Sequence, residues 1–174
     1  VKQQIFTHND NGALVETYKA MQEALKAQGF ETSAVEISAA SVESFVKSNQ
    51  ADLAAKGIKI EYKDGALTEA SAKAAFEAAM RMQAMALGDP GDRIYGLAPG
   101  AMMPSFDQEP DEHEVSGRMN LLGRLNDPAE LAEAALFLSH GWVASGTTLY
   151  IDSGQHLMRQ PRDVLFLARE QAGG

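Results

Sequence analysis

Apolar positions alternate along the chain between short runs with the spacing of β-strands and longer stretches with the spacing of helices. The short runs are predicted to form five strands, at residues 3–7, 32–37, 58–62, 93–97 and 147–151. The stretches between them place apolar residues three and four positions apart, as amphipathic helices do. Strands that alternate with helices are typical of a parallel sheet covered on both faces. We therefore predict a single α/β domain over residues 1–174, with an open, doubly wound, Rossmann-like parallel sheet of about five strands.

The sequence also marks where two helices begin. Thr68 precedes an Ala- and Met-rich stretch at 69–87, and Asp127 precedes a Pro, an Ala and a Glu at the start of 128–139. Thr and Asp are favoured N-caps, Pro is favoured in the first turn, and Glu at the third helical position completes a capping box. The segment 103–117 carries two prolines and a cluster of acidic residues, and we predict an exposed excursion there.

The composition limits the classes of partner and the cellular location that we expect for this chain. The net charge of −9 argues against a surface for nucleic acid or for an anionic membrane, because both need clustered Lys and Arg. The chain has no cysteine, which excludes disulfides and thiolate metal sites, and its four histidines lack the spacing of metal ligands. No apolar run reaches the about 18 residues of a membrane span. We expect a cytoplasmic protein with no metal site, no nucleic-acid partner and no membrane partner.

Two motifs in the second half of the chain belong together. The first is Ala98-Pro99-Gly100, at the end of a predicted strand, and the second is the run LGRLNDPAELAEAALFLSHGWVASGTTLYIDSGQHL from Leu122 to Leu157. Together they resemble the C-terminal half of short-chain dehydrogenases/reductases, and the ending QHL followed by QPRDV resembles the pteridine-reductase-like members. The resemblance is specific from Leu67 onward and weak before it. It implies a Rossmann-like fold and descent from NAD(P)-dependent oxidoreductases.

The resemblance also implies a glycine turn of the form TGxxxGxG after the first strand, where a dinucleotide lays its pyrophosphate. Thr7 and Gly12 match this pattern, whereas His8 and Leu14 stand where the family has its other two glycines. Side chains at those two positions obstruct the close approach of phosphate. No Asp or Arg follows the second strand to select NAD or NADP, and we expect no bound cofactor. The vestigial cofactor positions that the resemblance implies are Thr7, Gly12, Pro99 and Gly100.

The catalytic pair that the resemblance implies is Tyr-x-x-x-Lys, in which the lysine lowers the pKa of the tyrosine that exchanges a proton with the substrate oxygen. Lys73 stands at the lysine position, but Glu69 stands four residues earlier in place of the tyrosine. A Glu and a Lys at this spacing on a helix form an ordinary ion pair. Lys73 is therefore predicted as a vestigial catalytic position.

These departures favour a shortened, catalytically impaired family member that acts as a structural or regulatory subunit. We expect it in a homo-oligomer, or in a hetero-oligomer with an active, full-length family member, because the small residues of 69–87 would let a second helix approach closely. Loss of two family strands would give the strand order 2-1-3-4-5.

Two alternatives remain open. One is an active NAD(P)H-dependent oxidoreductase, similar to carbonyl or pteridine reductases, with NADP or NAD as its cofactor. The other is a small-ligand binding protein that uses the vacated crevice, lined by Gly12, Pro99 and Gly100.

Overall fold

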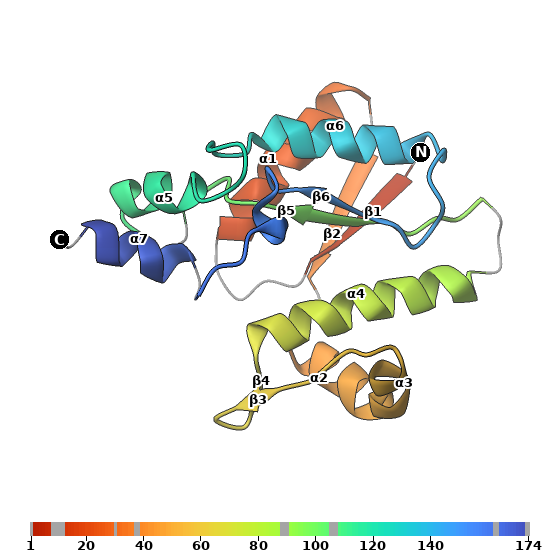
Figure 1. The fold of residues 1–174 in the computed structure, drawn as a ribbon. Coiled ribbons are helices and arrows are strands. Elements are labelled where there is room, and N and C mark those ends of the chain that lie inside the picture. Colours follow the sequence, from red (N-terminus) through yellow and green to blue (C-terminus); the bar gives the residue numbers. More distant parts are fainter. Residues whose placement is uncertain are drawn as a thin grey trace.

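We analysed a computed structural model of the chain, which describes residues 2–7, 13–29, 31–36, 39–87, 91–104, 108–161 and 164–172. Its elements form an α/β arrangement with two parallel strand pairs, one antiparallel hairpin and helices on both sides (Figure 1). The α/β class and the parallel pairing predicted from the sequence are thus confirmed.

The first parallel pair joins β1 (Lys2–Thr7) to β2 (Glu31–Glu36), with Lys2 opposite Glu31 and Thr7 opposite Glu36. Helix α1 (Ala13–Ala27) connects the two strands. This register brings the carboxyl ends of β1 and β2 together.

The second parallel pair joins β5 (Gly96–Pro99) to β6 (Thr148–Ile151), with Gly96 opposite Thr148 and Pro99 opposite Ile151. Among the described strands, no backbone pairing joins this pair to the first one. The predicted neighbours 2-1 and 4-5 are therefore found. The prediction that residues 58–62 form a strand between them is wrong.

Residues 62–67 instead form a hairpin of β3 (Tyr62–Lys63) and β4 (Ala66–Leu67), paired antiparallel. Its two loop residues both have positive φ, 53° at Asp64 and 83° at Gly65. Asp-Gly is the preferred sequence for such a two-residue turn, because its twist matches that of the flanking strands. The local turn thus decided the structure of this segment.

Helix α4 (Glu69–Ala86) begins at the predicted position. The hydroxyl oxygen of its N-cap, Thr68, accepts a hydrogen bond from the backbone N–H of Ser71 at 3.3 Å. One face of α4 packs on α2 (Ala39–Ser48), and Leu53 of α3 (Gln50–Ala55) joins the same core. The buried residues of this cluster are Val42, Val46, Leu53, Ala72, Ala75 and Ala78.

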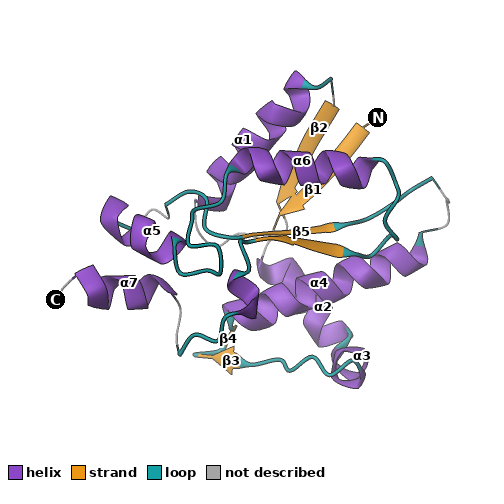
Figure 2. Ribbon diagram, turned by 45° about the horizontal axis from the view of Figure 1, so that its top comes forward, coloured by secondary structure: helices purple, strands orange, loops and turns teal. Residues whose placement is uncertain are grey.

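Helix α6 (Pro128–Ser139) also begins as predicted, with a capping box between Asp127 and Glu130. It packs against α1 and against the strands β5 and β6. This second core buries Met21, Leu25, Met102, Leu131, Ala132 and Leu136. In Figures 1 and 2 the β5–β6 pair lies between α6 on one side and α4 on the other.

The predicted excursion at 103–117 is wrong in its second half, because α5 (Pro110–Gly117) is a helix that buries His113, Ser116 and Gly117. Pro110 occupies the first helical turn, where its missing N–H costs nothing, so this proline starts a helix. After β6 follow the short 3-10 helix η1 (Gln155–Leu157) and helix α7 (Val164–Ala172). Helices α5 and α7 pack together beside the C-terminus (Figure 1).

Candidate functional site at the ends of strands β5 and β6

The carboxyl ends of β5 and β6 are in close contact, and no space for a side chain remains between them. The backbone N–H of Gly100 donates to the carbonyl oxygen of Ile151 at 3.0 Å, which extends the pairing by one residue. A Cβ atom built on Gly100 would lie 2.7 Å from Asp152 Cα and 2.7 Å from Asn126 Oδ1. Only glycine therefore fits at position 100. Because Gly100 has no side chain, its backbone can pack closely against the end of β6.

Asp152 organises the turn that follows β6. Its carboxylate accepts hydrogen bonds from the backbone N–H of Gly154 at 3.0 Å and of His156 at 2.8 Å. Its Oδ2 atom also lies 2.8 Å from Nδ1 of the His156 ring. Burial by itself raises the pKa of Asp152, but the hydrogen bonds from His156 and Gly154 outweigh it and hold that pKa below its ordinary value. Asp152 is thus a charged acceptor at neutral pH that fixes η1 to the end of β6.

The His156 ring is held on a second side by Tyr150. The two rings stack with centroids 4.3 Å apart and an angle of 26° between their planes. Because Nδ1 faces Asp152, Nε2 is the nitrogen left to exchange a proton or to bind a partner. An Asp–His pair of this kind can orient a proton acceptor, and here it also closes the turn.

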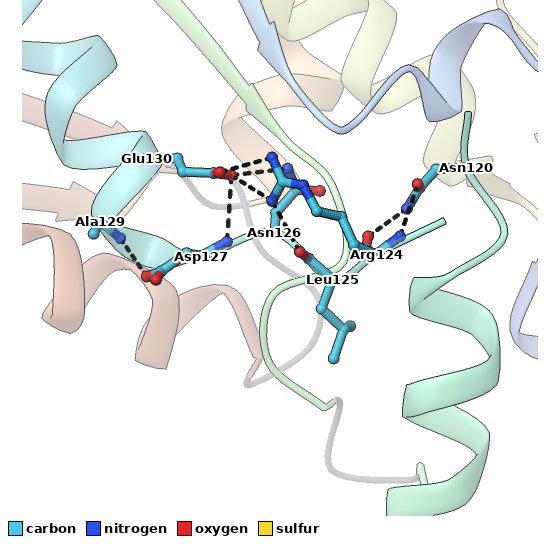
Figure 3. Close-up of polar contacts among 7 residues, drawn as sticks. All are labelled: Asn120, Arg124, Leu125, Asn126, Asp127, Ala129 and Glu130. Atoms are coloured by element: carbon cyan, nitrogen blue, oxygen red, sulfur yellow. Dashed lines mark hydrogen bonds and ion pairs between the residues drawn. The ribbon is translucent and has the colours of Figure 1, made fainter. Parts of the chain in front are cut away.

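A polar network holds the loop that leads into α6 (Figure 3). The guanidinium of Arg124 lies 2.7 Å from the Glu130 carboxylate, and its hydrogen bonds hold the pKa of Glu130 below the usual range. Asn120, which is buried, donates from Nδ2 to the carbonyl oxygens of Gly117 at 2.6 Å and Arg124 at 2.7 Å. The LGR motif therefore serves to fix the start of α6.

Two buried polar atoms at this site make no hydrogen bond within the described parts of the chain. They are Oδ1 of Asn126 and Oγ of Ser153. Ser153 also has a φ of 53°, in the left-handed region that favours glycine. A side chain in this region costs about 1 kcal/mol or more, so the turn here is strained.

These elements surround an open depression of about 690 Å³. Its apolar lining includes Leu121, Leu122 and Tyr150, and its charged lining consists of Arg124, Glu130, Glu133 and Asp152. The depression is therefore mainly apolar with a mostly acidic rim.

The structure places the predicted site residues on several elements. Pro99 and Gly100 lie at the end of β5, beside Asn126 and Asp152. Thr7 ends β1, and Lys73 is an exposed residue in the first turns of α4. Glu69 is the first residue of α4, and Gly12 lies outside the described residues. The assignment of these positions to a cofactor or to catalysis stays a prediction.

An acidic residue stands beside the end of β1. The register places Glu36, an acidic residue at the last described position of β2, opposite Thr7 of β1. The predicted strand ran to residue 37, so this acid was counted within the strand and not at its end. An acid at this place is the feature that dinucleotide-binding folds use for a ribose hydroxyl pair.

Sequence reasoning also missed the Asp152–His156 pair and its stacking on Tyr150. The sequence signal for this pair was the four-residue spacing between an Asp and a His. That spacing brings the two side chains together because Gly154, in the left-handed conformation, starts η1 between them. Across the described ranges, the His, Asp and Glu side chains form no group able to hold a metal ion. Within the same ranges, no helix has the length and apolarity to span a membrane.

Comparison with known proteins identifies the family. The family described as enoyl-(acyl carrier protein) reductase matches residues 63–156, more than half of the chain. An uncharacterized oxidoreductase of Schizosaccharomyces pombe, C922.06, is 35% identical over 97 residues, which are 52% of this chain and 38% of that protein. The chain belongs to the short-chain dehydrogenase/reductase family, as its motifs indicate.

Solved structures agree at the level of the fold. FolM alternative dihydrofolate reductase 1 from Brucella suis, in complex with NADP, has a TM-score of 0.51 at 18% identity and matches 92% of this chain and 87% of its own. The same enzyme from Brucella canis, complexed with NADP, has a TM-score of 0.50 at 16% identity, with 92% and 86% covered. The Rossmann-like fold is therefore shared with these proteins.

Proposed function

We propose that this chain is a family member that does not itself transfer hydride and that serves as a structural or regulatory subunit in a cytoplasmic assembly. The observation that carries the proposal is the start of α4, where Glu69 precedes Lys73 by four residues in place of the family's tyrosine. At neutral pH a carboxylate has no proton to give to a developing alkoxide.

The cofactor positions support the same conclusion. NAD(P) supplies the hydride in this family when it is bound. Helix α1 begins at Ala13, so Leu14 occupies its first turn, where the family pattern has a glycine. Asn126 and Asp152 occupy the space beside Gly100 where any other residue would carry its Cβ atom. A leucine in place of that glycine and a filled space beside Gly100 support the absence of a bound dinucleotide.

The assembly would not use the face of α4 that carries Ala72, Ala75 and Ala78. Ala72, Ala75 and Ala78 are buried against α2 and α3 of the same chain, so these small residues are not free to receive a helix from another subunit. Exposed apolar side chains lie elsewhere, with Leu121 and Leu122 more than half exposed beside the depression. Such a group of exposed leucines marks a surface for association.

Isothermal titration of NADPH and of NADH into the pure protein tests the proposal, with a full-length active family member as the positive control. We expect no binding in the micromolar range for this chain. Micromolar binding of either nucleotide, or turnover of a carbonyl substrate, would overturn the proposal. Native mass spectrometry with and without a full-length family member then separates a homo-oligomer from a mixed assembly.

The second candidate is an active NAD(P)-dependent oxidoreductase, and Glu36 at the end of β2 favours it, together with a fold shared with NADP-complexed reductases. An acid at this place prefers NAD over NADP, because it would repel a ribose phosphate. The same titration therefore distinguishes the candidates, since an active enzyme would bind NADH and lose this binding in Glu36→Ala.

A further inference from the structure

Strand β5 is paired along one of its two edges. The backbone N–H groups of Gly96 and Gly100 donate to carbonyl oxygens at β6, each at 3.0 Å. In a parallel ladder alternate residues bond to the same neighbour, so the backbone groups of Leu97 and Pro99 point away from β6. No other described strand pairs with β5 on that side. We call Leu97 and Pro99 the free edge of β5.

The free edge lies within the layers of the fold. Figures 1 and 2 show β5 between α6 on one side and α4 on the other. The side chain of Leu97 is partly buried against the core of Met21, Leu25 and Leu131. Its backbone N–H and C=O groups make no hydrogen bond to the parts of the chain that the structure describes. A backbone group withdrawn from water without a partner is unfavourable, so pairing at this edge would stabilise it.

The segment of this chain that is predicted for this place is engaged elsewhere. Residues 58–62 lead into the β3–β4 hairpin instead of forming a strand between the two parallel pairs. The backbone N–H of Glu61 donates to Oγ of Ser71 at 2.8 Å, and its carbonyl oxygen accepts from the N–H of Thr68 at 3.0 Å. Both backbone groups of Glu61 are therefore held at the start of α4, and this segment is not available to β5.

The hydrogen-bonding groups of the free edge do not match a second copy of themselves. Pro99 has no N–H, so the edge offers the N–H of Leu97 against the carbonyl oxygens of Leu97 and Pro99. Two such edges facing each other would lack donors. An extended segment with an N–H at every residue supplies the donors that this edge needs.

The surroundings of the free edge limit the side chains of such a segment. Leu97 on β5 and Ile151 on β6 pack on the same apolar core. A charged side chain beside these groups would lose its hydration, which is unfavourable. Strand β5 is four residues long. The segment that fits is therefore extended, about as long as β5, apolar at its centre and without proline.

We propose that the free edge of β5 binds an extended apolar segment of another protein, which joins the sheet as an added strand. In strand addition the main-chain hydrogen bonds provide affinity, and the alternate side chains provide specificity. This inference rests on the proposed role as a subunit and adds the surface and the kind of partner.

Amide hydrogen exchange of the full chain, followed by NMR, tests the free edge residue by residue. Ala98 is the internal control, because its alternate position on the same strand directs its N–H toward β6. In the chain alone we expect the Leu97 amide to exchange at least about tenfold faster than the Ala98 amide. Equal protection of the two amides would overturn the free edge.

The probe for the partner is the acetylated and amidated peptide Lys-Thr-Val-Ala-Val-Thr-Lys, which is apolar and uncharged at its centre. At about ten times its dissociation constant it should slow exchange at Leu97 roughly tenfold and leave Ala98 within about twofold. The matched control is the same peptide N-methylated at Val, Ala and Val. It keeps the side chains but loses donors on both of its edges, and it should give no protection.

The outcomes separate this inference from the proposed function. A Leu97 amide that the peptide leaves unchanged, or that the N-methylated peptide protects equally, would overturn the added strand. Protection of Leu97 that rises with the concentration of the chain alone would make a second copy the occupant and overturn the partner. The subunit role fails separately, in the titration with NADPH and NADH, which does not involve this edge.

Discussion

Replacement of Gly100 by alanine should destabilise the protein, because the new methyl group has no space. Its carbon would lie 2.7 Å from Asp152 Cα, 2.7 Å from Asn126 Oδ1 and 3.1 Å from Asp152 Cβ. Carbon atoms in contact prefer separations of about 3.5–4.0 Å. Two of the three obstacles belong to Asp152, and one of these is backbone, so a side-chain rotation cannot relieve the overlap.

The size of the destabilisation follows from the shift of β5 away from β6 that the new methyl group requires. Separation of β5 from β6 would stretch the 3.0 Å hydrogen bond from Gly100 N–H to Ile151 O. Overpacking costs about 1–3 kcal/mol, and a strained buried hydrogen bond adds roughly 1 kcal/mol. The reduced freedom of the unfolded alanine chain returns about 0.4–1 kcal/mol. We therefore expect a net loss of about 2–3 kcal/mol in the free energy of unfolding, or roughly 4–12 °C in Tm for a domain of this size.

Urea denaturation followed by circular dichroism measures this loss. Gly117→Ala is the control, because a methyl group there meets side-chain atoms only, Cδ2 and Cγ of Leu125, and that side chain can move away. We expect its cost to stay below about 1 kcal/mol. A Gly100→Ala variant as stable as the parent chain, or less affected than Gly117→Ala, would refute the close contact of β5 with Asp152.

Three further predictions concern the same edge of the fold. Ser153→Gly should stabilise the protein by about 1 kcal/mol, because it relieves a left-handed φ of 53° and removes a buried hydroxyl that has no partner; a loss of stability in thermal unfolding would contradict this. Asp152→Asn should cost about 2 kcal/mol at neutral pH, since it removes the charge from an acceptor of several hydrogen bonds. The folded pKa of Asp152 is lowered, so its contribution is fully present above the ordinary Asp pKa of about 3.9 and is lost as the pH falls through the lower folded value. Urea titrations at several acidic pH values should therefore show a smaller decline for Asp152→Asn than for the parent, and equal declines would disprove the effect. Asn120→Ala should cost about 2–3 kcal/mol in chemical denaturation, because the carbonyl oxygens of Gly117 and Arg124 lose their donor; a cost below about 0.5 kcal/mol would show that water replaces the amide.

The elements that the sequence predicted correctly are those with local causes. Thr68 and Asp127 cap their helices through hydrogen bonds that span three residues or fewer, so the cap can be read without the rest of the fold. The parallel pairs follow from the order of short apolar runs and longer helical stretches along the chain, which the sequence shows directly. Where prediction failed, at 58–62 and 110–117, an Asp-Gly turn and a proline in a first turn outweighed the apolar pattern.

The candidate site was predicted only in outline. The family motifs located Pro99 and Gly100, but they gave no reason for the glycine, which depends on Asn126 and Asp152, residues 26 and 52 positions away along the chain. The place of Glu36 opposite Thr7 was missed because the register of two paired strands depends on both of them, and neither sequence alone fixes it.

The sequence by itself determined the family, the helix starts and the missing tyrosine, because each depends on residue identity at fixed short spacing. Only the tertiary structure decided that the alanine face of α4 is covered by α2 and α3, that Gly100 is filled by Asp152, and that apolar side chains remain exposed beside β6. The physical reason is that packing joins residues far apart in the chain, and the space left for a side chain is a property of both surfaces that meet.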